Sequence, residues 1–246
     1  MKKMLALICA LALMMTVCSA LAESGVEDGV LTVAMECAYA PYNWTQPDDS
    51  NGAVPISNNL GMYANGYDVM TAKGICEANG WELQIVQADW ESLVPSVMVG
   101  SVDAVIAGQS MTAERMESVD FAGPYLYATI VGLAKQGTPN AEAKGISDLT
   151  GNATSQTGTI WYDVCLPQVQ GITVVPPTES APAMLMALES GAVDFVCTDM
   201  PTAQGAMIAY PDLVLLDAIN AYLADKTADD FNALMAEAIS VQPLGE

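Results

Sequence analysis

The sequence predicts an α/β fold with two similar lobes, each a parallel-rich sheet flanked by helices. Strand patterns alternate with helix patterns over residues 30–108, as they do in βαβ units. The order helix, glycine, Val-Asp, apolar strand and polar tip occurs at 93–110 and again at 178–199. Because this order occurs in both halves, we expect two lobes of similar topology.

The elements of the first half follow from periodicity and from end signals. VLTVAM is rich in β-branched residues, and WELQIVQA alternates along its length, which indicates two strands. Asn79-Gly80 is typical of a helix end, and Asp89 is typical of a helix N-cap. The predicted order is strand 30–35, helix 66–80, strand 81–88, helix 89–100 and strand 102–108.

The remaining segments are assigned in the same way. Residues 45–66 are polar and turn-rich, so we expect a long excursion between the first strand and the first helix. Residues 121–145 run from an extended aromatic segment, predicted to be a crossover strand, into a surface loop. We predict a helix at 178–191 and a strand at 192–199, and residues 217–239 also have helical spacing.

The first 22 residues have the features of a cleaved export signal. Lys2 and Lys3 form a charged start, an apolar run of 14 residues follows, and ALA at 20–22 resembles a cleavage site. The apolar run is shorter than the ~20 residues that span a bilayer. A lipoprotein anchored through Cys18 is the alternative, although MTV at 15–17 is a poor approach to a lipidated cysteine. We therefore expect an exported protein, periplasmic or extracellular.

The charge balance excludes several classes of function. Without the export signal, the chain has five basic groups against 29 acidic ones, a net charge of −24. Such a chain repels nucleic acids and anionic membrane surfaces, so we expect neither as a partner. The sequence has no histidine, which excludes Ser-His and Cys-His nucleophile systems and the usual imidazole metal sites. We expect no metal and no cofactor.

Four cysteines follow the export signal: Cys37, Cys76, Cys165 and Cys197. No Cys-x-x-Cys pair is present, so a zinc knuckle or a thioredoxin-type site is not expected. Buried thiols are the default interpretation, and a disulfide is the alternative in an exported chain.

Three polar residues fall at the predicted carboxyl ends of strands, where open α/β sheets bind ligands. Ser110 and Arg115 follow one strand, and Asp199 ends another. Arg115 is the only arginine of the chain. A guanidinium is a planar fork of donors that grips a carboxylate, and an aspartate accepts hydrogen bonds from an ammonium. Together, Arg115 and Asp199 would hold the two ends of a zwitterion.

Each of these residues also has a purely structural interpretation. Arg115 could be a solvated helix residue paired with Glu114. Asp199 could be a turn or cap residue before a proline. Ser110 or Thr112 could simply cap the helix that begins with TAER.

Aromatic residues and one turn supply further candidates. Tyr39 and Trp90 follow strands at the same predicted edge, although either residue taken alone is more typical of core or surface. SQTGTIW at 155–161 is typical of a turn followed by a helix, and the backbone amide of Thr159 could face an anion at the helix N-terminus.

A resemblance to a known family adds to these observations. The sequence blocks that carry it are LTVAMECAYAPYNW, GYDVMTAKGICEANG, ALESGAVDFVCTD and, as the most specific, VDAVIAGQSMTAER...VDFAGPY. Over about residues 28–215 the chain resembles the polar amino-acid-binding proteins of bacterial ABC transporters, solute-binding family 3. The resemblance implies a type II periplasmic-binding-protein fold, a two-lobed "Venus flytrap" that closes over an amino acid and delivers it to a membrane permease.

The resemblance also implies roles for the candidate residues. Arg115 matches the arginine that grips the ligand α-carboxylate, with Ser110 and the Gly108 backbone assisting. Asp199 matches the acidic residue that receives the α-ammonium.

Tyr39 matches the aromatic residue that covers the ligand, and Trp90 occupies a position that lines the pocket. Thr159 lies in the turn that matches the carboxylate-binding turn of the second lobe. The family has Thr, Ser or Gln where this chain has Ile160 and Trp161, so the resemblance does not imply which amino acid is bound.

The domain organisation implied by the resemblance is lobe 1 at 23–127, lobe 2 at 128–212, and a return to lobe 1 at 213–246. Family members make this return through a further strand before their last helices. Here PDLVLLD passes almost directly into AINAYLA, so the returning C-terminal part looks shortened unless LVLLD supplies the strand.

We therefore expect the extracytoplasmic binding component of an ABC transporter, a monomer without catalytic residues. The alternative is a lyase or dehydratase-type enzyme on the same scaffold that acts on a small carboxylate, with Asp199 or Glu114 as the acid/base group.

Overall fold

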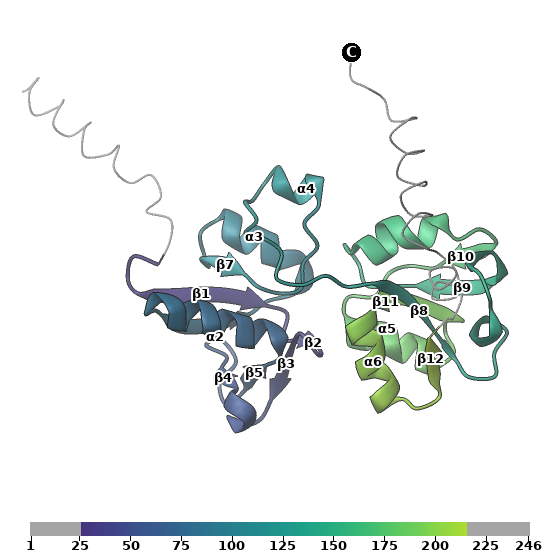
Figure 1. Ribbon diagram of the computed structural model, residues 1–246, viewed down its shortest axis with the longest axis horizontal. Coiled ribbons are helices and arrows are strands. Elements are labelled where there is room, and N and C mark those ends of the chain that lie inside the picture. The colour runs from purple at the N-terminus through teal and green to yellow at the C-terminus, as the bar shows by residue number, and fades with distance from the viewer. Residues whose placement is uncertain (1–25, 216–246) are drawn as a thin grey trace, which may run out of the picture.

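The computed structural model describes residues 26–215, which form two lobes, each around its own main β-sheet (Figure 1). We refer to residues 26–127 as the first lobe and to residues 128–215 as the second lobe. Within the described part of the chain, the backbone passes between the lobes once, just before β8 (Ile130–Lys135). The predicted export signal and the helix predicted at 217–239 lie outside the described residues.

The main sheet of the first lobe is parallel, as the βαβ pattern predicts. Its central strand is β1 (Val30–Met35), which pairs with β6 (Glu82–Gln87) on one side and β7 (Ala104–Val105) on the other. The helices α2 (Tyr67–Asn79) and α3 (Leu93–Met98) precede β6 and β7, so each β-α-β crossover contributes one helix. These elements match the predicted ranges with two exceptions: β7 is shorter than predicted, and the helix predicted at 89–100 is divided into a 3-10 segment, η2 (Trp90–Ser92), and α3.

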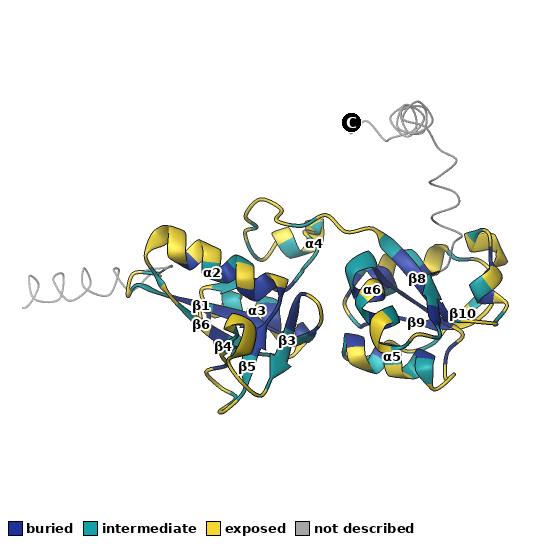
Figure 2. Cartoon of the chain, turned by 60° about the horizontal axis from the view of Figure 1, so that its bottom comes forward, coloured by how far each residue is buried: buried dark blue, intermediate teal, exposed yellow. Residues whose placement is uncertain are grey.

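The strand β1 is buried on both faces, because it lies in the middle of the sheet with helices nearby. Val33 packs with Ile85 of β6 in one hydrophobic cluster, whereas Ala34 packs with Leu93 of α3 in another. Adjacent residues of a strand point to opposite faces, so this alternation places a core on each side of the sheet. Figure 2 shows the corresponding dark blue interior of this lobe.

The excursion predicted as turn-rich contains a small antiparallel sheet. Its strands are β2 (Ala38–Tyr39), β3 (Asn43–Gln46), β4 (Val54–Pro55) and β5 (Tyr63–Asn65), in the order β2-β3-β5-β4. The Asn43 side chain secures this sheet, since it accepts from the Cys37 amide at 2.7 Å and donates to Asp68 Oδ2 at 2.7 Å. Strands of two to four residues are too short for an alternating pattern to identify them.

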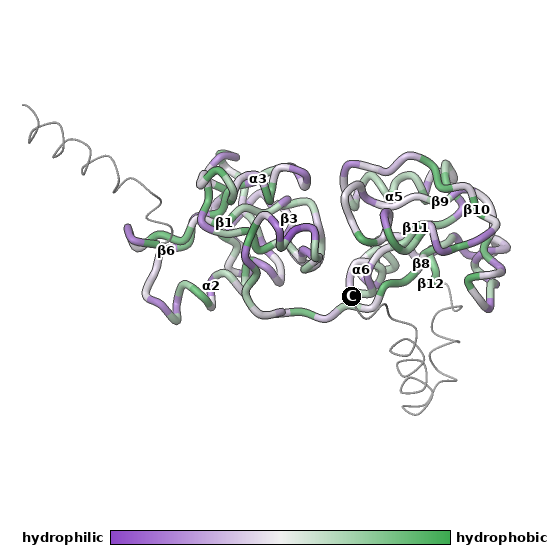
Figure 3. The backbone as a smooth tube through the Cα atoms, turned by 90° about the horizontal axis from the view of Figure 1, so that it is seen from above, coloured by the Kyte–Doolittle hydropathy of each residue, from purple (hydrophilic) through white to green (hydrophobic). Residues whose placement is uncertain are grey.

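The second lobe has one mixed sheet of five strands. The strand β8 pairs antiparallel with two neighbours, and the remaining pairs are parallel. The order is β10 (Ile172–Val174), β9 (Gly151–Thr154), β11 (Phe195–Asp199), β8 and β12 (Leu213–Leu215). Figure 3 shows β8 and β12 as mostly hydrophobic stretches of the chain.

Two helices cover this sheet. The helix α5 (Ala181–Glu189) begins at Ser180, whose hydroxyl caps the Ala183 amide at 3.4 Å, and it buries Met184 and Leu188. The helix α6 (Met200–Ala209), which the sequence analysis did not predict, starts directly after β11. Short helical segments complete the chain: η1 (Ser50–Gly52), η2 (Trp90–Ser92), α4 (Ala113–Met116), η3 (Asn140–Glu142), η4 (Ile146–Asp148), η5 (Trp161–Cys165) and η6 (Leu166–Gln168).

Two sequence-based expectations need correction. Residues 121–129 contain no strand, and the predicted crossover strand is confined to β8. The return to the first lobe is predicted to begin at 213, but Leu213–Leu215 form β12, which pairs with β8 inside the second sheet, and the rest of LVLLD lies outside the described residues. In this antiparallel pair, Leu213 lies opposite Lys135 and Val214 lies opposite Ala134 of β8.

None of the helices in the described part of the chain has both the length and the apolar character needed to cross a membrane.

Candidate functional site

The carboxyl ends of the first-lobe strands face the second lobe, and hydrogen bonds join the two lobes there. Trp90 Nε1 donates to the Gly158 carbonyl at 3.3 Å, and the Thr157 hydroxyl donates to Glu91 Oε1 at 3.1 Å. Tyr42 Oη donates to Asp199 Oδ1 at 3.0 Å. The edge at which the sequence predicted a ligand site is therefore the surface at which the lobes meet.

Arg115 lies on α4, which follows the end of β7. Its Nη1 donates to the Ser110 carbonyl at 2.7 Å, and its Nη2 reaches across to the Gly158 carbonyl at 2.8 Å. The guanidinium carbon also lies 5.6 Å from the centre of the Trp90 ring, within cation–π range. Burial lowers the pKa of Arg115, and the nearby Glu114 and Asp163 carboxylates oppose this effect. The side chain is therefore not a solvated helix residue: it connects the lobes.

The cap of α4 is Thr112, whose hydroxyl accepts from the Arg115 amide at 3.2 Å. Ser110 contributes its backbone carbonyl to Arg115 instead. Of the two residues considered as caps, the structure thus assigns this role to Thr112.

Asp199 is the last residue of β11 and the N-cap of α6, and it is 2% exposed. Oδ1 accepts from the Thr202 amide at 2.9 Å, and Oδ2 accepts from the Thr202 hydroxyl at 3.0 Å. The Tyr39 and Tyr42 hydroxyls donate to the same carboxylate from the first lobe. Asp199 is therefore a cap, as its structural interpretation proposed, and it also lies at the meeting point of the lobes.

A small cavity of about 10 Å³ lies where the lobes meet. Six of the seven predicted site residues line it, and Asp199 lies next to it through its bond to Tyr39. The full lining is Tyr39, Trp90, Gly108, Ser110, Arg115, Gln156, Thr159, Ile160 and Trp161. This volume holds about one water molecule, so the small cavity alone does not hold an amino acid of about ten heavy atoms.

A larger cavity of about 530 Å³ adjoins the small one and shares part of its wall, including Tyr39, Ser110 and Trp161. It extends between β7 and residues 119–126, and Asp199 also lines it. Its size lies within the range of small-molecule sites.

Gly108 allows the close approach of an aromatic ring in this wall. Its φ is +61°, and a Cβ at this position would lie 3.0 Å from the Tyr39 ring. Its amide donates to the Tyr125 hydroxyl at 2.9 Å, and that hydroxyl donates to Asp68 at 2.7 Å. The absence of a side chain at Gly108 therefore leaves room for the Tyr39 ring, and the Gly108 amide has its own acceptor.

Thr159 lies in the turn before η5 and is buried. Its hydroxyl donates to the Gln156 carbonyl at 2.7 Å, and its carbonyl accepts from the Tyr162 amide at 3.1 Å. These bonds hold the turn 156–159, and with it the Gly158 carbonyl that Arg115 and Trp90 contact.

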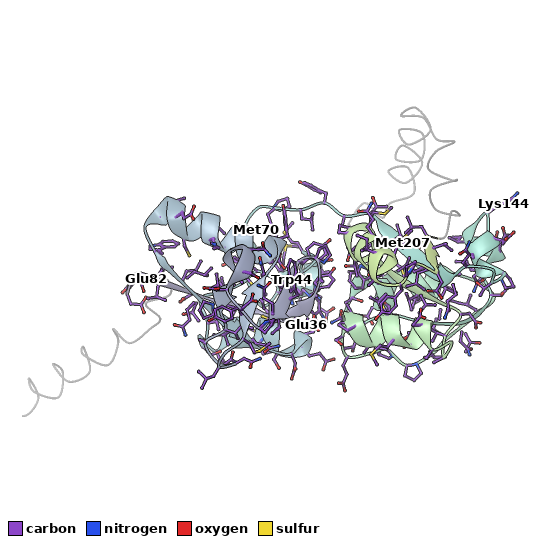
Figure 4. All side chains as sticks on the ribbon, turned by 90° about the horizontal axis from the view of Figure 1, so that it is seen from below. Glu36, Trp44, Met70, Glu82, Lys144 and Met207 are labelled. Carbon is purple, nitrogen blue, oxygen red and sulfur yellow. The ribbon has the colours of Figure 1, made fainter. Side chains whose placement is uncertain are left out.

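A buried carboxylate that the sequence analysis did not single out also lies at this junction. Glu36 follows β1 directly, is 6% exposed, and accepts from Gln156 Nε2 at 3.1 and 3.2 Å. Figure 4 labels Glu36 on the side of the first lobe that faces the second. Its position at the carboxyl end of a central strand is the signal that could have identified it.

Burial raises the pKa of Glu36 to about 7, and the charge of Asp89 adds to this, whereas the Gln156 hydrogen bond opposes it. Glu36 in turn contributes, after burial, to raising the pKa of the Cys37 thiol to about 12. The residues described by the structure provide no salt bridge to Glu36. The junction of the lobes therefore contains a carboxyl group that favours either a proton or a cation.

The first prediction concerns this carboxyl group. Because its folded pKa lies above its usual 4.5, its contribution to stability is complete below about pH 4.5 and is lost as the pH rises through about 7. We expect Glu36→Gln to be more stable than the wild type by about 3 kcal/mol at pH 7.5 and to be nearly equal in stability at pH 4.5. Urea unfolding at several pH values measures this difference.

The matched control is Glu77→Gln, on the exposed surface of α2. Its difference from the wild type should not change over the same pH range. If both variants showed the same pH dependence relative to the wild type, the raised pKa of Glu36 would be contradicted.

No cluster of three or more histidine, cysteine, aspartate or glutamate side chains with a metal-binding arrangement occurs within residues 26–215. Three of the four cysteines in this range are buried thiols, and Cys165 is partly exposed.

A model of the family described as "Bacterial extracellular solute-binding proteins, family 3" matches residues 31–236. Among curated proteins, the chain is 27% identical over 150 residues to a probable histidine-binding protein of Campylobacter jejuni, covering 61% of this chain and 57% of that one. The chain spans between 31% and 59% of the length of the first curated relatives that it matches.

Two solved structures have a similar fold. The arginine-bound form of a truncated ArgBP from T. maritima has a TM-score of 0.64 at 29% identity, over 77% of this chain and 82% of that one. An ancestral amino-acid-binding protein described as a precursor of cyclohexadienyl dehydratase has a TM-score of 0.65 at 25% identity, over 78% of this chain and 79% of that one.

Proposed function

Because the chain belongs to the bacterial extracellular solute-binding proteins, family 3, we propose that it captures a polar amino acid between its lobes and delivers it to a membrane ABC permease. The observation that carries this proposal is the position of Arg115. A guanidinium of the first lobe contacts the second lobe at the wall of a cavity that both lobes line. A ligand bound there contacts both lobes and therefore favours their closure.

The α-carboxylate of the ligand is assigned to Arg115. In the structure the guanidinium donates to two neutral carbonyls, those of Ser110 and Gly158. A carboxylate that replaces the Gly158 carbonyl forms a charge-assisted bond, which is about twice as strong as a neutral one. Trp90 packs over the guanidinium and keeps it in this orientation.

The α-ammonium is assigned to Asp199, which carries the negative charge at the opposite side of the junction. Tyr39, bonded to Asp199 and stacked on Tyr42 with 4.5 Å between ring centres, forms the aromatic wall between the two charges. Separation of the lobes frees the acceptor sites that the two tyrosine hydroxyls occupy. An ammonium of the ligand can then take the place of these donors.

Glu36 accepts hydrogen bonds from Gln156, which lines the small cavity, and through this contact with the site it favours a ligand with a cationic side chain. A buried carboxylate without a positive partner is costly, and a bound cation removes this cost. Relatives named for arginine and histidine agree with this assignment. We therefore propose a basic amino acid, arginine first, as the ligand.

The second prediction tests the ligand class. A thermal-shift screen of the twenty amino acids, followed by calorimetry, should identify arginine with a binding free energy of about −8 kcal/mol, which is about 0.7 kcal/mol for each of roughly twelve heavy atoms. Glu36→Gln should lose the preference for arginine over glutamine but keep the binding of the common α-amino acid group. A wild-type protein that binds glutamate better than arginine would contradict the role of Glu36.

A lyase of small carboxylates on the same scaffold is the second candidate function. The specific observation in its favour is Glu36, whose pKa of about 7 suits a general acid. In addition, one of the similar solved structures is described as a precursor of cyclohexadienyl dehydratase. Incubation with a cyclohexadienyl carboxylate distinguishes the two. Recovery of the unchanged compound supports the binding role, and accumulation of a dehydrated product supports the enzyme.

We also propose that the protein acts as an exported monomer, in agreement with the extracytoplasmic family to which it belongs. Light scattering of the purified protein, with and without arginine, tests the oligomeric state.

A further inference from the structure

Two cysteines that are far apart in the sequence lie together in the second lobe. Cys165 ends η5, and Cys197 is the middle residue of β11, which packs against η5. The packing of η5 against β11 brings both thiols into one hydrophobic cluster. Cys197 belongs to the hydrophobic core of this lobe, and Cys165 packs against the edge of that core.

The two thiols differ in reactivity. Cys165 is partly exposed, and the hydrogen bond from Cys197 lowers the pKa of the Cys165 thiol to about 7. Cys197 is buried, and the contact with Cys165 together with burial raises its pKa. An accessible thiolate beside a buried thiol is the arrangement in which the first attacks an external disulfide and the second resolves the product.

We propose that Cys165 and Cys197 form a disulfide when the protein meets a disulfide oxidant outside the cytoplasm. The family is extracytoplasmic, and protein disulfides persist in that compartment when it is oxidising. Oxidation shortens the contact between the sulfur atoms to about 2.05 Å. The main chain of η5, a single helical turn, would shift to allow this shorter distance between the sulfur atoms.

With a small-molecule disulfide such as glutathione disulfide as the oxidant, the chemistry is complete. The Cys165 thiolate attacks one sulfur of the oxidant, forms a mixed disulfide and releases one glutathione thiolate. Cys197 Sγ then attacks Cys165 Sγ and releases the second glutathione thiolate, which takes the Cys197 proton. The two protein thiols lose two electrons in total, and the oxidant is reduced to two thiols.

The bond would fix two parts of the candidate site to each other. The helix η5 begins at Trp161, whose ring lies 6.0 Å from that of Tyr39, and β11 ends at Asp199, two residues after Cys197. A link between them holds the second-lobe wall of the cavity against the sheet. The oxidised protein should therefore have a more rigid second lobe.

The experiment uses the full chain without its export signal, first reduced and then incubated with glutathione disulfide. We expect the loss of two free thiols, a Cys165–Cys197 linked peptide in mass spectrometry, and a rise in Tm of about 7 °C or more that dithiothreitol reverses. Cys76→Ala is the matched control, because it removes a thiol elsewhere and should leave the linked peptide unchanged.

Cys197→Ala should stop the reaction at the mixed disulfide on Cys165, and Cys165→Ser should leave Cys197 unmodified because it is buried. The proposal is overturned if the oxidised wild type carries glutathione on Cys165 without a link to Cys197, or if both residues remain free thiols. None of these measurements requires an amino-acid ligand, so the outcome is independent of the proposed function.

Discussion

Replacing Arg115 with alanine is expected to weaken amino-acid binding by about 100-fold or more. The guanidinium can donate two charge-assisted hydrogen bonds to a carboxylate, each contributing about 1.5–3 kcal/mol. The fold should remain, since Arg115 lies on the short helix α4 and is not part of a hydrophobic cluster. Calorimetry with arginine measures the loss, and circular dichroism verifies the fold.

Two further variants define the cause of this loss. Arg115→Lys keeps the charge but not the planar fork, so its affinity should lie between those of the wild type and the alanine variant. Lys144→Ala, at an exposed position remote from the junction (Figure 4), should bind like the wild type. Wild-type affinity in Arg115→Ala would exclude Arg115 from the ligand site.

Replacing Asp199 with alanine is expected to lower the ratio of closed to open molecules by about 100-fold. The reason is that two tyrosine hydroxyls lose a charged acceptor, and each of these hydrogen bonds contributes about 1.5–3 kcal/mol. Tyr39 and Tyr42 come from the first lobe, so their bonds exist only while the lobes are in contact. Small-angle scattering should therefore show a larger radius of gyration than for the wild type.

Asp199→Ala should also lower the free energy of unfolding by about 1–2 kcal/mol, because it removes the N-cap of α6. Asp199→Asn is the matched control. It retains a cap and a hydrogen-bonding partner for the hydroxyls, but it lacks the charge that an ammonium needs. The Asp199→Asn variant should therefore stay closed. It should lose more affinity for arginine than for an arginine analogue that lacks the α-amine. Equal losses for the two ligands would argue against the assigned role.

Much of the fold could be predicted from the sequence because long elements carry their own periodicity. Strand β1 was predicted with its observed bounds, and the ends of α2 agree with the signals at Asn79 and Gly80. The strands β9 and β10, of four and three residues, were not predicted, because their edges depend on tertiary pairing rather than on local pattern. The helix α6 was missed because its apolar residues surround the axis without a polar stripe that would mark an exposed face.

In the candidate site, too, some residues could be predicted from the sequence and others could not. The positions of Arg115 and Asp199 follow from the rule that ligands bind at the carboxyl ends of strands, and the structure brings both to the junction of the lobes. The pairing of Glu36 with Gln156 is different, since 120 residues separate them and the hydrogen bond joins one lobe to the other. The chain has 29 acidic residues, and nothing in the local sequence distinguishes Glu36 from the others.

The indole of Trp90 gives the protein an intrinsic optical reporter. Its N–H donates to a carbonyl of the opposite lobe, and the residue is 8% exposed, packed on a first-lobe cluster that includes Leu93. When the lobes separate, water replaces the carbonyl at the indole N–H, so the emission of this tryptophan should move to longer wavelength. The opening and closing of the unlabelled protein can thus be followed by fluorescence in a stopped-flow instrument, with Trp90→Phe identifying the signal.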